Sequence, residues 1–276
     1  MLRRIIPTQG VLFIILLATS LGCASETKQG TPEWIVESFF ISKEFPNHVK
    51  YYTGEMLQHY VDVPNMGSRV SEGTKTYYRI ISETKNRKNF AITYSNKNMC
   101  QNWYCYVVKQ KGDLKLEAVR ALALTGVLHS LLEQLEEKEV RTEEENWMLE
   151  NLRLRLACDE ELKEYLKANL EKFTEIVKTF SEDPNLLRVQ GLEKSVERTG
   201  PQLASNKPIA STVHELHLNF VNQASKGVIE LNIGGVVDNS VGFLFITDED
   251  KVPQMSPGPY IYVEKITGSW YIYKTT

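Results

Sequence analysis

The sequence predicts an α+β fold: N-terminal helices on an antiparallel sheet, then a central helical segment, then a C-terminal antiparallel sheet. Changes in the hydrophobic period lead to this prediction. Apolar residues recur at helical spacing over 34–40, alternate as in strands over 78–119, and return to helical spacing over 124–135. After Pro208 the alternation resumes. Helices and strands separated along a chain in this way are typical of α+β proteins.

We expect five segments along the chain. They are a cleaved signal peptide (1–22), a short lipidated tether (23–30), an α+β domain (31–122), a helical segment (123–200) and an antiparallel sheet region that packs on the helices (201–276). The mature chain is long enough for one large or two modest domains. Its 42% hydrophobic residues suffice for packed cores.

Individual elements have their own signals. Thr31 and Pro32 predict the start of the first helix, and a short second helix is expected within 53–61. Thr142 and Glu145 fit a capping box. A last helix is predicted from Asp183 to about residue 200. Strands are expected at 216–220, 229–233 and 241–245, and a closing hairpin at 260–274.

The first 23 residues have the composition of an export signal. Arg3 and Arg4 precede an apolar run of eleven residues, which is followed by Gly22 and Cys23. A helix that crosses a bilayer needs roughly 20 apolar residues. The run is therefore expected to be removed rather than to span the membrane.

The leader resembles that of bacterial lipoprotein precursors at Ser20, Leu21, Gly22 and Cys23. The resemblance implies cleavage before Cys23, a diacylglycerol on its sulfur and an acyl chain such as palmitate on its amine. Several acyl chains anchor a protein stably. Leucine normally stands three residues before the cysteine, where this chain has Ser20. The alternative is an ordinary secretory leader that is cut after Ala24.

The residues after Cys23 and the charge of the chain bear on its partners. No aspartate follows Cys23, which in this family implies sorting to the outer membrane, facing the periplasm, or to the cell membrane where no outer membrane exists. The expected partners are this membrane, through the lipid, and an unidentified envelope protein. Without residues 1–22 the chain has 30 basic and 35 acidic residues, a formal charge of −5. Nucleic acid is not expected, because it requires a concentrated basic face.

The remaining cysteines suggest a disulfide. Cys100 and Cys105 are expected to pair, because they are close in sequence and disulfides persist in exported proteins. Two unpaired thiols are the alternative. Cys158 would then be a single small apolar residue on a helix face. No metal site is predicted, because neither a second cysteine pair nor a nearby histidine pair completes four ligands.

Residues 31–40 and 52–56, together with the strands up to Arg120, resemble the nuclear-transport-factor-two-like fold, a cone of helices against a curved sheet. Enzymes with such folds place an acid or a histidine inside the cavity as a general base. His48, His59 and Asp62 are the candidates here, with surface placement as the alternative. A base also needs a shaped, dry pocket, so no catalytic residue is predicted.

Other motifs are weak. No nucleophile elbow, phosphate loop or dinucleotide fingerprint occurs, and no cofactor is predicted. His214 and His217 are the nearest approach to a ligand pair, but on a strand they would point to opposite faces. Eight glutamates within 133–150 indicate a solvated helix surface, with an acidic docking face as the alternative. Five aromatic residues either form an exposed binding face or pack on half-buried sheets: Trp103, Tyr104, Trp270, Tyr271 and Tyr273.

These observations predict a membrane-anchored, non-catalytic accessory or binding protein of the bacterial cell envelope. A small-molecule-binding protein or enzyme with a cavity in the N-terminal domain is the alternative. A third possibility is a spacer whose central helices project the C-terminal sheet away from the membrane.

Overall fold

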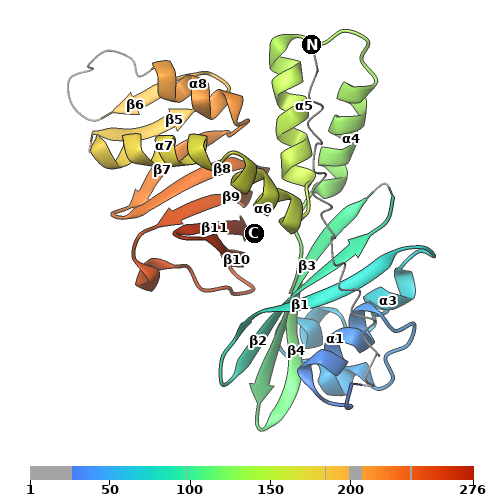
Figure 1. The fold of residues 1–276 in the computed structure, drawn as a ribbon. Helices are drawn as coiled ribbons and strands as arrows, with labels where there is room; N and C mark the ends of the chain where they lie inside the picture. Colours follow the sequence, from blue (N-terminus) through green and yellow to red (C-terminus); the bar gives the residue numbers. More distant parts are fainter. Residues whose placement is uncertain (1–26, 98, 184, 199–206, 237) are drawn as a thin grey trace, which may run out of the picture.

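The chain folds as two antiparallel sheets with helices packed on them, which confirms the α+β class (Figure 1). The computed structural model describes residues 27–97, 99–183, 185–198, 207–236 and 238–276. Sheet A has the strand order β1-β2-β3-β4 and sheet B the order β10-β11-β9-β8-β7-β5-β6. In Figure 1 sheet A lies at the lower right and sheet B at the left, with a helical hairpin beside both.

The N-terminal helices begin as the sequence predicts. The Thr31 side chain accepts a hydrogen bond from the backbone N–H of Trp34, and Pro32 occupies the first turn, where a missing N–H costs nothing. The elements of this part of the chain form a four-stranded meander with helices on one face. They are α1 (Pro32–Phe40), η1 (His48–Tyr51), α2 (Gly54–His59), α3 (Met66–Arg69), β1 (Lys75–Glu83), β2 (Arg87–Ser95), β3 (Cys100–Gln110) and β4 (Asp113–Arg120).

The inner strands of sheet A, β2 and β3, are buried on both faces, and residues alternate in direction along each strand. On β3, Cys105 and Val107 belong to the core shared with α1 and α2. Tyr104 and Tyr106 belong instead to the core shared with sheet B. Sheet A therefore lies between its own helices and the C-terminal half of the chain.

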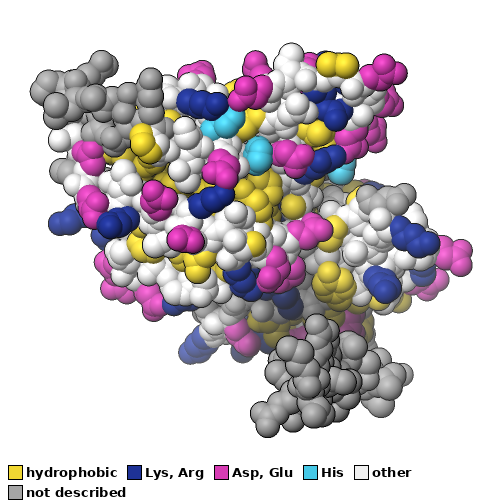
Figure 2. All heavy atoms as spheres, turned by 45° about the horizontal axis from the view of Figure 1, so that its top comes forward, with side chains coloured by type: hydrophobic (Ala, Val, Ile, Leu, Met, Phe, Trp, Pro, Cys, Tyr) yellow, Lys and Arg dark blue, Asp and Glu magenta, His cyan; other side chains and the backbone are white. Residues whose placement is uncertain are grey.

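A helical hairpin, α4 (Thr125–Glu136) and α5 (Glu143–Leu156), connects the sheets. The predicted capping box is confirmed: Thr142 and Glu145 each accept a hydrogen bond from the other's backbone N–H. Buried leucines join the two helices. Figure 2 shows acidic side chains interspersed with basic and apolar ones over this end of the molecule. Among the glutamates within 133–150, Glu136, Glu145 and Glu150 form surface ion pairs, as on an ordinary solvated helix face.

The last third of the chain forms sheet B and the helices that cover it. The main core runs through both sheets and the helices from α6 onward. The elements are α6 (Asp159–Ala168), α7 (Leu170–Glu182), β5 (Leu186–Gln190), β6 (Val196–Arg198), α8 (Lys207–Glu215), β7 (Phe220–Ser225), β8 (Val228–Val236), β9 (Asn239–Ile246), η2 (Glu249–Lys251), β10 (Tyr260–Thr267) and β11 (Trp270–Thr275).

The predicted elements between residues 183 and 220 are wrong in two places. Instead of a last helix, the chain forms the β5–β6 hairpin, because Leu186 and Val189 are buried when β5 pairs with β7. The helical segment thus ends at Glu182. The strand expected from residue 216 begins only at Phe220, after α8. The closing hairpin, β10–β11, is confirmed.

Candidate functional site

Sheets A and B meet where β3 faces β10. The rings of Tyr104 and Tyr262 are stacked, with centroids 4.6 Å apart and planes 15° from parallel. The Tyr106 hydroxyl donates to the carbonyl of Ile261 at 2.7 Å. Both tyrosines of β3 are fully buried, so this contact excludes water and makes the junction a continuous part of the core.

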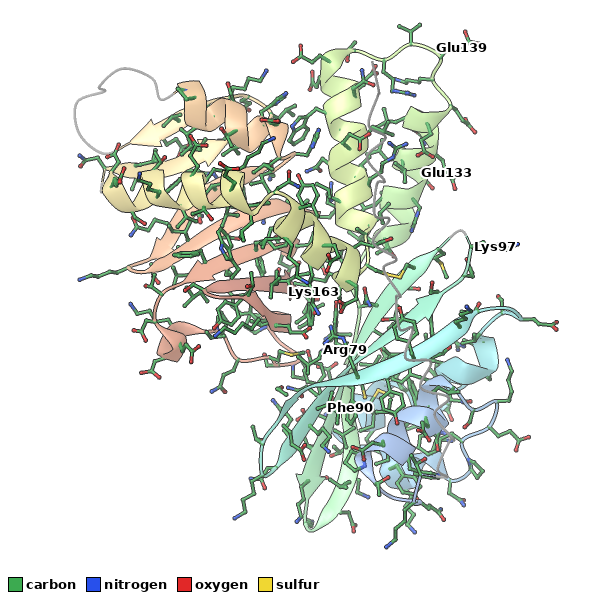
Figure 3. The ribbon with its side chains drawn as sticks, viewed as in Figure 1. Arg79, Phe90, Lys97, Glu133, Glu139 and Lys163 are labelled. Atoms are coloured by element: carbon green, nitrogen blue, oxygen red, sulfur yellow. A yellow bond between two sulfur atoms is a disulfide. The ribbon has the colours of Figure 1, made fainter. Side chains whose placement is uncertain are left out.

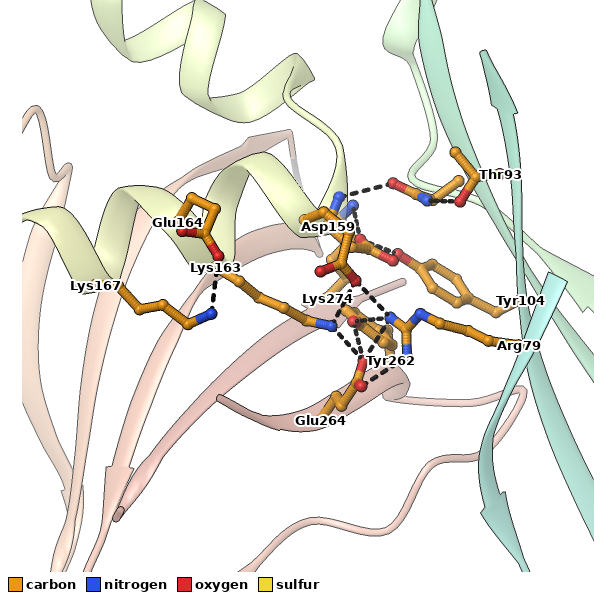
Figure 4. Close-up of polar contacts among 12 residues, drawn as sticks. Arg79, Thr93, Tyr104, Asp159, Lys163, Glu164, Lys167, Tyr262, Glu264 and Lys274 are labelled. Carbon is orange, nitrogen blue, oxygen red and sulfur yellow. Dashed lines mark hydrogen bonds and ion pairs between the residues drawn. The ribbon is translucent and has the colours of Figure 1, made fainter. Parts of the chain in front are cut away.

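A buried ion pair lies beside this stack (Figure 4). The Lys274 ammonium is 2.8 Å from Oδ1 of Asp159, and the Tyr104 hydroxyl donates to the same oxygen at 2.8 Å. Asp159 is only 1% exposed and Lys274 only 4%. The Asn102 side chain accepts the backbone N–H of Asp159. Sheet A, α6 and β11 are therefore joined through one carboxylate, whose removal would leave a buried charge without a partner.

A second cluster of charges continues the junction toward its surface. Figure 3 shows Arg79 and Lys163 directed into the region between the sheets. The Arg79 guanidinium donates to Glu264 at 2.6 Å and to the Tyr262 hydroxyl at 2.9 Å. The Lys163 ammonium lies 3.0 Å from the same carboxylate. Strand β1, helix α6 and strand β10 thus converge on Glu264.

Two titratable groups of the junction, Glu264 and Tyr104, have pKa values that are shifted away from neutrality. Burial alone would raise the pKa of Glu264, but hydrogen bonds from Arg79, Tyr262 and Lys163 lower that pKa overall. Burial, and then the charge of Asp159, raise the pKa of the Tyr104 hydroxyl. A general acid or base needs a pKa near the working pH, and these pKa values move away from neutrality. The arrangement suits attachment of two sheets better than proton transfer.

A disulfide reinforces the same junction, and it is not the predicted one. Cys100 on β3 is bonded to Cys158, the residue before α6, with Cα atoms 5.8 Å apart. Cys105 is a buried free thiol. The prediction of a Cys100–Cys105 bond is wrong, because five residues along a strand separate Cα atoms by about 17 Å and an odd offset points the side chains to opposite faces.

An open cleft of about 1100 Å³, here called the intersheet cleft, lies next to the junction. Its walls are the end of sheet A that carries the β1–β2 and β3–β4 turns, and strand β10 with the loop before it. Two of its cations are held in ion pairs: Arg87 with Glu117 at 2.7 Å, and Lys265 with Glu249 at 2.6 Å. The walls therefore offer mixed polar and apolar groups rather than one dominant charge.

The candidate bases of the N-terminal domain do not converge in a cavity. The His48 ring is hydrogen-bonded to the carbonyl of Val61 at 2.7 Å, while His59 and Asp62 are exposed. Side chains fill the core between α1, α2 and sheet A, and Phe40 in that core is fully buried. His59 and Asp62 thus occupy the surface placement that the sequence left open, whereas His48 is half-buried against Phe45 and Tyr52.

His214 and His217 do not lie on a strand as expected. His214 is on α8, and His217 follows that helix in a left-handed conformation with φ of 49°. Both rings lie near the indole of Trp147, with centroids 5.9 and 6.2 Å away. Burial lowers the pKa of His217. The two histidines thus help to pack α5 against the end of α8.

The aromatic residues pack rather than form an exposed face. Tyr104, Trp270, Tyr271 and Tyr273 are each at most 5% exposed, and Trp103 is half-buried. The alternative of packing on the sheets is therefore the right one.

The sequence did not single out Arg79, Asp159, Glu264 or Lys274 as site residues. A signal did exist for Lys274, which is a charged residue within the aromatic strand 270–275. Such a position requires a buried partner. Nothing in the sequence identifies Asp159 as that partner, since 115 residues separate the two.

Cys23, the predicted lipid attachment site, lies outside the described residues. Within the described ranges, no helix is both long and apolar enough to cross a bilayer. No group of three or more His, Cys, Asp or Glu side chains in the same ranges could hold a metal ion. No protein-family model, curated protein or solved structure matches this chain.

Proposed function

We propose that this chain is a membrane-anchored accessory protein of the bacterial cell envelope that binds a segment of a protein partner in the intersheet cleft. The observation that carries the proposal is the cleft itself, whose two walls come from different sheets. The proposal includes export, removal of residues 1–22 and lipid attachment at Cys23.

The form of the cleft favours an extended polypeptide over a metabolite. Small-molecule sites usually enclose about 300–1000 Å³ with mainly apolar walls. This cleft is open, larger and mixed in polarity. One wall includes β10, one of the two edge strands of sheet B. An edge strand has backbone groups that an added strand can pair with, and side chains on the opposite wall can then select the sequence.

The walls are also held in a fixed arrangement. The hydrogen bond from the Tyr104 hydroxyl to Asp159, the Arg79–Glu264 pair and the disulfide all cross between sheet A and the C-terminal half. A binding site that is formed in advance loses less conformational entropy when its partner binds. The ion pairs of the junction, Asp159–Lys274 and Arg79–Glu264, balance these charges without a substrate, in keeping with a non-catalytic role, while Oδ2 of Asp159 is buried without a hydrogen-bond partner.

The small-molecule alternative receives less support. It requires a pocket in the N-terminal domain against which His48, His59 or Asp62 could act. The core of that domain is instead filled by aromatic side chains such as Phe39 and Tyr52. A relation to nuclear-transport-factor-two-like proteins remains part of the proposal, supported by helices on one face of a four-stranded sheet.

The anchor is tested by metabolic labelling with a tagged fatty acid. We expect label on the wild-type chain and none on Cys23→Ala, together with release of that variant from the outer-membrane fraction. Because several acyl chains anchor a protein stably, the labelled protein should fractionate with its membrane. An unlabelled wild-type chain would refute the anchor.

The cleft is tested by in-cell photo-crosslinking from Asn86 and Lys109, exposed residues of its wall. Lys178, exposed on α7, is the matched control position. We expect one stoichiometric protein to be captured from the cleft positions and not from Lys178. Equal capture from all three positions, or no capture together with metabolite turnover by the purified protein, would contradict the proposed function.

A further inference from the structure

A second, smaller cavity of about 160 Å³ lies where α4 begins, α5 ends and β11 ends. The ionisable side chains that line it are all basic: His129 on α4, Arg155 on α5 and Lys274 on β11. The cavity is separate from the intersheet cleft, with which it shares no lining residue. Its chemistry therefore calls for its own explanation.

Arg155 is the unbalanced charge in this cavity. Its side chain is half-buried, its Nε is buried without a hydrogen-bond partner, and its Nη2 donates to the carbonyl of Gly235 at 3.0 Å. It forms no ion pair with any residue of the described ranges. By contrast, Arg153 on the same helix pairs with Glu136 and Glu150 at 2.9 and 2.7 Å. A half-buried cation without a counter-charge has lost part of its hydration, so an anion in the cavity would stabilise it.

The other groups around the cavity either are neutralised or favour an anion. The charge of Lys274 is balanced by Asp159. Thr125 and Gly126, at the start of α4, line the cavity, and neither a side-chain cap nor an acidic residue occupies that first turn. Free backbone N–H groups and the helix dipole there add positive potential to that of Arg155.

We propose that this cavity binds a small oxyanion of phosphate or sulfate size, with the Arg155 guanidinium as its main ligand. A planar guanidinium can donate two parallel hydrogen bonds to such a group. At roughly 30 Å³ for each water, the cavity of about 160 Å³ has room for about five waters, enough for one phosphate group but not for a nucleotide. The phosphate is either free or the end of a larger molecule, such as a lipid headgroup.

Calorimetric titration of the mature chain with inorganic phosphate and with sulfate, at constant ionic strength in chloride, tests the site. We expect saturable binding that Arg155→Gln weakens by roughly tenfold or more. Arg153→Gln removes the same charge two residues earlier on α5, at a residue that does not line the cavity. This variant should bind phosphate as the wild type does. Absence of saturable binding to the wild type would overturn the proposal. Equal weakening in both variants would also overturn it, because the loss would then reflect only the general charge of the surface.

A second variant guards against loss of structure in Arg155→Gln. His129 is exposed at the cavity, so His129→Glu should keep the thermal unfolding midpoint while the added carboxylate abolishes phosphate binding. Unchanged binding in a folded His129→Glu would also overturn the site. Competition of phosphate binding by glycerol phosphate, compared with vesicles that contain phosphatidic acid, whose phosphate is also terminal, separates a soluble ligand from a lipid headgroup.

Discussion

At the scale of individual residues, the disulfide shows how one pair of side chains can connect distant parts of the chain. Cys100 and Cys158 are 58 residues apart in sequence, and their bond closes a loop that contains most of β3, all of β4 and the α4–α5 hairpin. Cross-linking a loop of this length removes much of the entropy of the unfolded chain. Cys105, which a sequence-based pairing would use, instead packs as a small apolar residue against α1.

Cys158→Ser is therefore expected to lower the free energy of unfolding by about 4 kcal/mol under oxidising conditions, by loop-entropy arithmetic. Cys105→Ala removes only a buried sulfur and should cost about 1 kcal/mol. Urea unfolding of both variants, with peptide mapping of the wild-type chain, measures the difference. A larger loss in Cys105→Ala, or a mapped Cys100–Cys105 peptide, would contradict the structure.

At the scale of one element, α5 is held on sheet B by side chains that reach backbone carbonyls. The Asn151 amide donates to the carbonyls of His217 at 2.7 Å and Ile233 at 2.6 Å. The Trp147 indole donates to the carbonyl of His214 at 2.8 Å. The His214 and His217 carbonyls lie at and just after the end of α8, and Ile233 lies at a register shift of β8. The His214 carbonyl also accepts the backbone N–H of His217 at 2.9 Å, so α5 adds to the hydrogen bonding of these groups.

Asn151→Ala should destabilise the chain by about 2–3 kcal/mol, because two buried carbonyls lose their donor. Hydrogen exchange should then show faster exchange in α5 and at residues 214–217 than in sheet A. Asn146→Ala, at an exposed position of the same helix, is the control and should change little. Uniformly faster exchange across both sheets would show that α5 does not open as a separate unit.

Which elements the sequence could predict follows from how local their causes are. The capping box at Thr142 and the alternating strands of sheet A depend on near neighbours, and both are confirmed. Leu186 and Val189 have helical spacing, yet a bulge in β5 and its pairing with β7 place them in the core. For α8 a local signal existed, since Pro208 suits a first turn and Ile209, Val213 and Leu216 recur at helical spacing.

The candidate site was less predictable than the elements. Its walls and ion pairs join residues that lie far apart along the chain, as Arg79 and Glu264 do. Hydrophobic period does not encode such partners, and a surface charge and a junction charge look alike in sequence. Only the isolated Lys274 within an aromatic strand gave a usable signal.

At the scale of the whole molecule, the position of the two sheets depends on ionised groups. The lowered pKa of Glu264 means that its carboxylate binds protons less readily in the folded chain than in the unfolded chain. Its contribution to stability is therefore fully present above the ordinary glutamate pKa of about 4.3 and is lost as the pH falls through the lower folded value. Acid should thus loosen the junction between the sheets.

Glu264→Gln should lower the free energy of unfolding at neutral pH by about 2 kcal/mol, because it removes a charged acceptor of three donors. It should also flatten the fall in stability below about pH 4.3. Urea unfolding across that range, with Glu171→Gln on the exposed face of α7 as the control, measures both effects. A wild-type slope in Glu264→Gln would show that other carboxyl groups govern the acid response.

The Cys100–Cys158 bond also determines what a protease would leave behind. Val140, in the turn between α4 and α5, is 86% exposed and lies between Lys138 and Arg141, two sites that trypsin can cut. Because the whole hairpin lies within the covalent ring, a nick there would not release a fragment. The nicked chain would run as one species until a reductant separated it into two.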